Sequence, residues 1–212
     1  MVSEGDKLIY TINNHKVKHG DIMLGVDNLM LNEKADFIYS DPPWGQGNLK
    51  YWQTMNVKMN DGIRNDPDYN NFINNFFNII SKFSKDKILI EYGERWREDI
   101  INMCIKYNLI HNEVVTSYYK AGAKMLPLDF HFISKKQKYD LNDDIRNKVA
   151  TLSGQKVVHA VFDFWCPKDS KIILDPMCGM GYTAQATVDR NMSFRGNELN
   201  KKRLDKTIKR LQ

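Results

Sequence analysis

Cysteine is scarce in this chain. Only three of the 212 residues are cysteine, namely Cys104, Cys166 and Cys178. They show no Cys-x-x-Cys spacing and have no paired histidine nearby. Disulfide frameworks and zinc sites both depend on such clusters. We therefore expect reduced thiols, a cytoplasmic protein and no bound metal ion.

Long apolar runs are missing as well. No stretch approaches the roughly 18 apolar residues of a membrane-spanning helix, and residues 1–6 lack a signal-peptide pattern. Hydrophobic residues nevertheless make up 42% of the chain, which is enough for one good core. We expect a protein without membrane attachment that forms a single domain over residues 1–212.

Positive charge is mild overall but concentrated near the C-terminus. The formal net charge is +5, and residues 195–210 hold seven Lys or Arg side chains against Glu198 and Asp205. A basic helix of this kind can face nucleic-acid phosphates, and it can equally be a solvated helix face. Charge alone leaves both interpretations open.

The most informative stretch is an apolar run that ends in two prolines. Residues 37–39, Phe-Ile-Tyr, favour a strand, and Asp41-Pro42-Pro43-Trp44 follows almost at once. The prolines carry no N–H, so this turn offers carbonyl and carboxylate acceptors, and Trp44 adds a flat apolar face. Such a group suits a planar ligand with donors, such as the exocyclic amine of a nucleobase. Asp-Pro-Pro also occurs in ordinary turns, and this motif alone does not separate the two interpretations.

Strands and helices alternate along most of the chain. The alternation predicts an α/β fold with an open, mostly parallel Rossmann-like sheet and helices on both faces. Residues 1–15 are polar and expected to be partly irregular, and residues 135–156 are charged and carry no strong pattern. Residues 45–65 are predicted to be a loop, either a functional lid or disordered. Strands are predicted at residues 16–19, 37–39, 87–93, 113–119, 130–134, 171–175 and 192–196. Helices are predicted near residues 23–31, from the N-cap Asp66 to residue 83, after the strand at 87–93 to about residue 107, at 157–165, at 182–190 and in the basic segment near the C-terminus.

A second motif lies near the C-terminus. An apolar strand runs into Asp175-Pro176-Met177-Cys178-Gly179-Met180-Gly181 and then into a helix. Glycines let a backbone bend sharply and approach a ligand closely, and a following helix presents free N–H groups. This is the architecture of a nucleotide site at the carboxyl end of a parallel strand, but it is not the triphosphate-binding Gly-x-x-x-x-Gly-Lys loop. Glu198, after the next strand, is placed either to hold ribose hydroxyls or to stabilise a helix N-terminus.

Together the two motifs resemble those of the amino-methyltransferases that act on nucleic-acid bases. Their order, with the Asp-Pro-Pro-Trp turn first and the glycine turn last, resembles the permuted, β-type arrangement of DNA N6-adenine and N4-cytosine enzymes. The resemblance covers roughly residues 16–210 and implies a Rossmann-like methyltransferase sheet with S-adenosyl-L-methionine as cofactor. Met177 stands where the family usually has an aromatic residue, and we expect a reshaped pocket wall there.

The resemblance also implies roles for individual residues. Asp41, Pro42, Pro43 and Trp44 would form the catalytic tetrad: Asp41 and the Pro42 carbonyl accept the amine N–H bonds of a flipped base, and Trp44 stacks on it. The expected cofactor contacts are Asp21 (which could equally be a helix cap), Asp175, Pro176, Cys178, Gly179, Gly181, Thr183, Glu198 and Asn200. Lys50, Tyr51 and Trp52 are the candidate nucleic-acid contacts, although the two aromatic residues could instead belong to a core strand.

The expected activity is direct methyl transfer to N6 of adenine in DNA. Asp-Pro-Pro-aromatic is more typical of adenine enzymes, whereas Ser-Pro-Pro is frequent in N4-cytosine enzymes. Because Trp44 is also typical of RNA N6-adenosine enzymes, an RNA substrate remains an alternative, as do an N4-cytosine DNA enzyme and a non-catalytic cofactor-binding subunit. No insertion large enough for a separate target-recognition domain lies between the motifs. Specificity would then be relaxed, or a homodimer or a separate specificity subunit would supply it.

Overall fold

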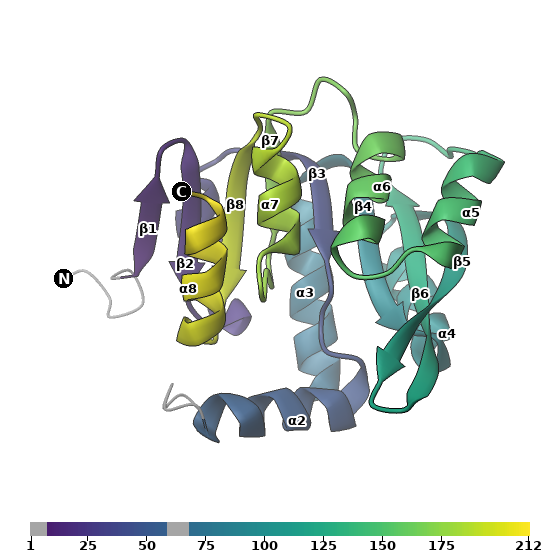
Figure 1. Cartoon of the computed structure of the whole chain (residues 1–212), viewed down its shortest axis with the longest axis horizontal. Coiled ribbons are helices and arrows are strands. Elements are labelled where there is room, and N and C mark those ends of the chain that lie inside the picture. The colour runs from purple at the N-terminus through teal and green to yellow at the C-terminus, as the bar shows by residue number, and fades with distance from the viewer. Residues whose placement is uncertain (1–7, 59–67) are drawn as a thin grey trace.

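The computed structural model describes residues 8–58 and 68–212 and places one sheet at the centre of the molecule (Figure 1). Within this part of the chain the sheet has eight strands in the order β1-β2-β8-β7-β3-β4-β6-β5. Their bounds are β1 Ile9–Ile12, β2 His15–His19, β3 Ala35–Ser40, β4 Ser84–Gly93, β5 Ile110–Ala121, β6 Lys124–Ser134, β7 Ile172–Asp175 and β8 Ser193–Glu198.

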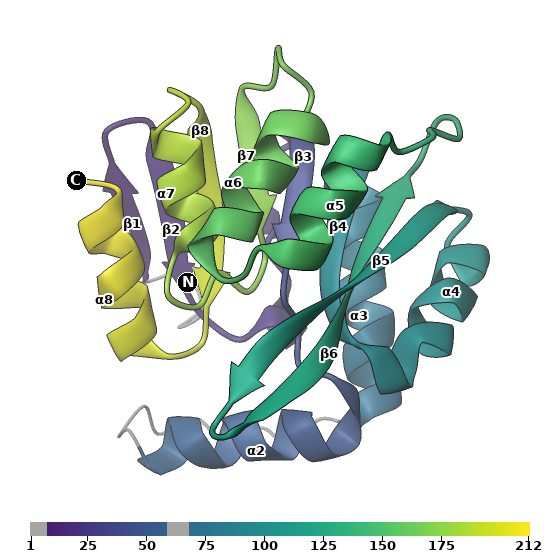
Figure 2. The same ribbon diagram turned by 45° about the vertical axis from the view of Figure 1, so that its right-hand side comes forward.

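The middle of the sheet is parallel and its edges are antiparallel. Strands β2, β8, β7, β3 and β4 pair in parallel, whereas β1 pairs with β2, and β6 pairs with both β4 and β5, in the antiparallel direction. The hairpin of β5 and β6 extends beyond the rest of the sheet toward α2 (Figure 2). The open, mostly parallel α/β sheet predicted from the alternation is therefore confirmed.

Helices cover both faces of the sheet, as predicted. Helices α3 and α4 pack on one face, where the aromatic stripe of α3 meets Ile38 of β3. Helices α5 and α6 pack on the other face over Phe37, and α7 and α8 continue that layer (Figure 1).

None of the described helices is long and apolar enough to cross a membrane. The helices are α1 Asp27–Met30, α2 Gly45–Lys58, α3 Tyr69–Phe83, α4 Arg97–Lys106, α5 Asp143–Thr151, α6 Gln155–Phe164, α7 Tyr182–Val188 and α8 Lys201–Arg210, with 3-10 turns η2 Ile22–Leu24 and η3 Glu94–Trp96.

The register of β3 and β4 decides which side chains reach the carboxyl edge of the sheet. Ile38 faces α3, whereas Tyr39 and its β4 partner Leu89 face α6, because successive side chains of a strand point to opposite faces. Glu91 lies two residues after Leu89 in β4, and Asp41 lies two residues after Tyr39, just past the end of β3. Both therefore emerge on the α6 side, next to each other.

Two elements lie where the sequence showed no strong pattern. Strand β1 arises in the segment expected to be irregular, because Ile12 pairs with His15 across a two-residue turn and Asn13 adopts a positive φ of 52°. Helix α5 arises within residues 135–156. Asn142 caps it through a bond from the Ile145 N–H of 3.0 Å, and only Ile145 and Val149 are buried. Two buried positions give too weak a hydrophobic periodicity to predict this helix from the sequence.

The predicted loop at residues 45–65 is wrong over its first part, because residues 45–58 form helix α2. The inward positions of α2 follow helical spacing at Leu49, Trp52 and Gln53, but Leu49 is the only buried hydrophobic side chain among those described in α2. Residues 59–65 lie outside the described part of the chain, as do the expected cap Asp66 and Pro67. Helix α3 instead begins at Tyr69, and the carboxylate of its N-cap Asp68 accepts the Asn71 N–H.

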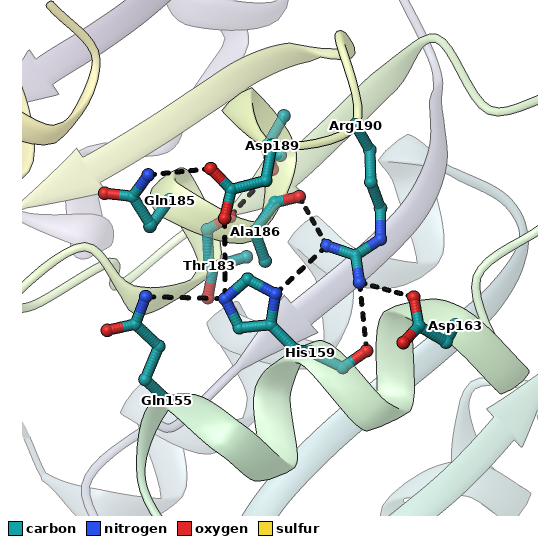
Figure 3. Close-up of polar contacts among 9 residues, drawn as sticks. Gln155, His159, Asp163, Thr183, Gln185, Ala186, Asp189 and Arg190 are labelled. Atoms are coloured by element: carbon teal, nitrogen blue, oxygen red, sulfur yellow. Dashed lines mark hydrogen bonds and ion pairs between the residues drawn. The ribbon is translucent and has the colours of Figure 1, made fainter.

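A polar network on the outer surface ties α6 to α7 (Figure 3). Arg190, just after α7, donates to the Ala186 carbonyl at 2.9 Å and contacts His159 Nδ1 of α6 at 3.2 Å. The same guanidinium pairs with Asp163 of α6, and Asp189 lies 3.7 Å from His159 Nε2. These contacts hold the C-terminal end of α7 against α6.

Candidate active site

A cavity of about 710 Å³ lies at the carboxyl ends of the parallel strands. Its volume falls within the range of small-molecule sites, and the position is the one where open α/β sheets bind ligands. Both sequence motifs line it, although they lie at opposite ends of the chain, and α2 contributes a further part of the wall. The predicted site residues that reach the cavity include Asp21, Asp41, Trp44, Asp175, Gly179 and Glu198.

Hydrogen bonds fix the Asp-Pro-Pro-Trp turn at the end of β3. The indole Nε1 of Trp44 donates to Asp41 Oδ1 at 3.1 Å. The buried Tyr92 hydroxyl donates to the Pro43 carbonyl at 3.3 Å and accepts the Gly45 N–H at 3.4 Å. All four residues of the predicted tetrad line the cavity, with the Asp41 side chain accessible from it. The turn thus presents a fixed carboxylate to whatever occupies the cavity.

Glu198 organises the glycine turn. Its Oε2 accepts the Gly179 N–H at 2.9 Å, and its Oε1 accepts the Asn200 N–H at 2.7 Å. Gly179 and Gly181 have positive φ angles of 48° and 79°, which favour glycine. A Cβ atom at Gly181 would lie 2.7 Å from Thr207 Oγ1, whereas one at Gly179 would meet no described atom within 4 Å. Gly181 therefore permits helix packing, and the space beside Gly179 is left for a ligand.

The remaining predicted cofactor residues fall into two groups. Asp21, Cys178 and Thr183 line the cavity. Asp21 also caps η2, because its Oδ1 accepts the Met23 N–H at 2.9 Å, which confirms the helix-cap interpretation, whereas the cofactor contact stays a prediction. Asn200 and Pro176 do not line the cavity. Asn200 is buried and caps α8 through a 3.0 Å bond from the Arg203 N–H, and the Pro176 carbonyl accepts a bond from Asn197.

The three candidate nucleic-acid contacts occupy different environments on α2. Lys50 and Tyr51 are exposed, whereas Trp52 is partly buried and lines the cavity. The guanidinium of Arg203 lies 4.1 Å from the centre of a Trp52 ring, an attractive cation–π arrangement. This contact joins α2 to the start of α8. The alternative of a core strand is excluded for Tyr51 and Trp52, since both belong to a helix.

Three acidic side chains face the cavity from neighbouring parallel strands: Asp41, Glu91 and Asp175. Burial raises the pKa of Asp175 to about 7, and the charge of Asp41 adds to this effect. Burial also raises the pKa of Glu91, again with a contribution from Asp41, while a hydrogen bond from the Tyr39 hydroxyl opposes the rise. Glu91 is a site residue that sequence reasoning missed. Its signal is a carboxylate inside the apolar run of residues 88–92.

Asp41 experiences opposing influences. Its side chain is accessible from the cavity, but the surrounding protein shields it from bulk water, and this desolvation raises its pKa. The Trp44 N–H and the positive charge of Arg203 lower that pKa. The cavity as a whole concentrates negative charge in a poorly solvated space. A cationic ligand would relieve this repulsion and return the carboxylates to their ionised form.

Two buried acceptors in the cavity wall lack partners within the described residues. They are Oε1 of Gln53 and Oδ1 of Asn197. Buried polar atoms are rarely left unpaired, so a ligand with hydrogen-bond donors fits this wall. S-adenosylmethionine has that chemistry: it carries a sulfonium, an ammonium, ribose hydroxyls and an adenine amine. The residues present therefore fit this cofactor.

The parallel strands, the cavity at their carboxyl ends and the strand order define a Rossmann-like α/β fold, and solved structures share it. The chain aligns with the M1.HpyAVI-SAM complex at a TM-score of 0.67 and 15% identity, covering 92% of this chain and 98% of that one. It aligns with PvuII DNA methyltransferase (cytosine-N4-specific) at 0.65 and 10% identity, covering 96% and 88%. TTHA0409 of Thermus thermophilus, complexed with S-adenosyl-L-methionine, gives 0.57 and 14%, covering 93% of each chain. No protein-family model and no curated protein sequence matches the chain. At these identities the likeness establishes the fold.

Proposed function

We propose that this protein is an S-adenosylmethionine-dependent DNA methyltransferase that modifies N6 of adenine. One observation carries the proposal: a single cavity is lined by both the Asp-Pro-Pro-Trp turn and the glycine turn. A donor and an acceptor can therefore meet in it. The described solved structures of this fold, which include methyltransferase complexes with the cofactor, support the same conclusion. Residues 1–212 would form one methyltransferase domain.

The glycine-turn half of the cavity would hold the cofactor. Asp175 and Glu198 supply negative charge there, and the Asn197 acceptor and the open space beside Gly179 lie next to them. Bound S-adenosylmethionine supplies an activated methyl group on a sulfonium centre, which attracts carboxylates. Glu198 is already engaged by two backbone N–H groups, which fix its orientation, and its remaining lone pairs would accept the ribose hydroxyls.

The Asp-Pro-Pro-Trp half would hold the acceptor base. An exocyclic amine is a weak nucleophile because its lone pair is delocalised into the ring. Asp41 and the Pro42 carbonyl would accept its two N–H bonds, which lets the nitrogen pyramidalise and aim its lone pair at the methyl group. Trp44 holds Asp41 in place and offers a flat face to the base. Alignment of this kind supplies a large part of the rate enhancement.

Exposed cations and aromatic rings near the cavity would contact the nucleic acid. Lys50 and Tyr51 lie on the outer side of α2, and the tip of the β5–β6 hairpin carries exposed Lys120, Lys124 and Tyr118. Both views place that tip beside α2 (Figures 1 and 2). Lysines hold phosphates, and aromatic rings fill the space that a flipped base leaves. DNA would therefore lie across α2 and the hairpin.

Methyl transfer to matched oligonucleotides tests the substrate. The purified full chain is incubated with methyl-labelled S-adenosylmethionine and with duplex DNA, single-stranded DNA or RNA of the same sequence, and the modified base is identified by mass spectrometry. We expect N6-methyladenine in DNA. Label in RNA alone or in N4-methylcytosine would replace the proposed substrate by one of the alternatives. Cofactor binding without any transfer would indicate a non-catalytic subunit.

A further inference from the structure

Helix α2 carries one buried polar side chain whose acceptor no described residue satisfies. Gln53 is 8% exposed, lines the cavity, and has no hydrogen-bond partner for Oε1 in the described part of the chain. An unpaired buried amide oxygen destabilises a protein, and native structures contain few of them. Because Gln53 lies in the cavity wall, the missing donor is expected to come from a ligand.

The surroundings of Gln53 restrict what that ligand can be. Gln53 follows Leu49 by four residues, so the two side chains share one face of α2. Leu49 is buried in one packed cluster with Ile22 of η2 and Phe72 of α3, and all three line the cavity. The carboxamide therefore lies beside an apolar wall that is suited to a flat ring. Asp21, directly before Ile22, also lines this part of the cavity.

The position of Gln53 along α2 separates it from the acceptor base. Trp44 and Asp41 stand at the start of α2, and Gln53 lies nine residues after Trp44, which corresponds to roughly 13 Å along a helix. The cation–π contact between Trp52 and Arg203 places this end of α2 next to α8 instead. Gln53 is therefore far from the amine that Asp41 would hold.

We propose that Gln53 recognises the exocyclic amine of the cofactor's adenine ring, with the ring packed against Ile22, Leu49 and Phe72. The Oε1 atom accepts an N–H bond of the amine and thereby gains the partner that it lacks. Gln53 is then a specificity-determining residue for the cofactor. This inference rests on the proposed function, because it takes S-adenosylmethionine as the ligand. It also gives α2, the helix that follows the catalytic turn, a direct part in cofactor binding.

Calorimetric titration of the full chain with two ligands tests the inference. One ligand is S-adenosylhomocysteine, and the other is its analogue with hydrogen in place of the purine amine. We expect the wild type to bind the analogue about tenfold more weakly, the scale of one lost hydrogen bond. Gln53→Leu keeps the volume but loses the acceptor, so its preference should fall below about threefold. Gln53→Glu keeps an acceptor and should retain the preference, and Thr54→Ala, exposed on the same helix, should behave as wild type.

The outcomes separate this inference from the proposed function. A wild type that binds S-adenosylhomocysteine without preference over the analogue overturns the role of Gln53 and leaves the proposed function standing. A full preference retained in Gln53→Leu overturns it as well, and this arm requires the variant to melt cooperatively. If the wild type binds neither compound, both the proposed function and the inference fail.

Discussion

The indole Nε1 of Trp44 donates a hydrogen bond of 3.1 Å to Oδ1 of Asp41. The first and last residues of the Asp-Pro-Pro-Trp turn are thus joined, and the bond lowers the pKa of a carboxyl group that burial raises. A carboxylate can accept an amine N–H bond only through an oxygen that is not protonated. The aromatic residue of the motif therefore both orients Asp41 and favours its ionised form.

Replacing Trp44 tests this relationship. Trp44→Phe keeps a flat ring but removes the donor to Asp41, so the pKa of Asp41 should rise further. The acidic limb of the pH profile of kcat/KM should then move to higher pH, and turnover at neutral pH should fall about tenfold or more, since hydrogen bonds to charged groups are among the stronger ones. Trp96→Phe changes a nearby indole that makes no bond to Asp41 in the structure and serves as the control. An acidic limb at the same pH in Trp44→Phe and wild type would show that the bond does not set the ionisation of Asp41.

Stability should depend on pH because of the buried carboxyl groups. The folded-state pKa is raised to about 7 for Asp175 and to about 8 for Glu91, from ordinary values near 4. Their protonation therefore favours the folded chain. The associated stability is fully present below about pH 4 and is lost as the pH rises through about 7 to 8.

Urea denaturation without ligand at a series of pH values measures this effect. From these groups we expect a free energy of unfolding that falls between pH 5 and pH 8. Glu91→Gln removes one titrating group while keeping polar atoms near Tyr39, so its stability should decline less steeply. The control Glu94→Gln changes an exposed carboxyl group that lies outside the cavity. A slope that is as steep in Glu91→Gln as in wild type would contradict the assignment of Glu91.

Cofactor affinity should depend on the glycine turn and its carboxylate. Glu198→Ala should weaken S-adenosylmethionine binding by about tenfold or more, because it removes the proposed ribose contacts and frees the N–H groups of Gly179 and Asn200. Gly179→Val should weaken binding by filling the space beside the turn. Gly181→Ala is the structural comparison: its Cβ would strike Thr207, so it should lower thermal stability first. Unchanged calorimetric affinity in folded Glu198→Ala and Gly179→Val would remove the cofactor from this turn.

The exposed side of α2 should contribute to DNA binding through charge. Lys50→Ala should weaken binding of a short duplex and reduce the slope of log K against log salt by about one, while S-adenosylmethionine affinity stays the same. Lys168→Ala is a matched control. Lys168 is exposed and lies shortly before β7, at the amino ends of the parallel strands, whereas the cavity lies at their carboxyl ends. Identical salt slopes in wild type and Lys50→Ala would exclude this lysine and direct attention to Lys201, Lys202 and Arg203 of α8.

The fold and the two motifs of the site could be predicted because each depends on short, contiguous stretches of sequence. Apolar runs that end in Asp41-Pro42-Pro43-Trp44 or in the glycine turn mark strand ends, and parallel strands bring such ends to one edge. The helix at residues 45–58 could not be predicted in this way. Its core-facing side is narrow, and the bond from the Tyr69 N–H to the Gln46 side chain forms only in the folded chain.

The parts of the site that sequence reasoning missed depend on register and packing. Glu91 joins the site because β4 lies beside β3 with Tyr39 opposite Leu89, and no local pattern specifies that pairing. In the sequence Gln53 is an ordinary polar residue, and only the position of α2 beside the cavity marks it as a site residue. Conversely, Asn200 resembles a ligand residue by its position after Glu198, yet it is the buried cap of α8.

Separating cofactor binding from methyl transfer in Asp41→Asn tests the central claim most directly. Asparagine keeps the shape of the side chain but replaces the charged carboxylate with a neutral amide, which is a weaker acceptor for the amine N–H and turns one oxygen into an NH₂ donor. S-adenosylmethionine affinity, measured by calorimetry, should stay within about threefold of wild type, while single-turnover formation of N6-methyladenine in duplex DNA, measured by mass spectrometry, should fall at least about a hundredfold. Wild-type rates of N6-methyladenine formation by Asp41→Asn would contradict the assignment of this cavity as the site of transfer.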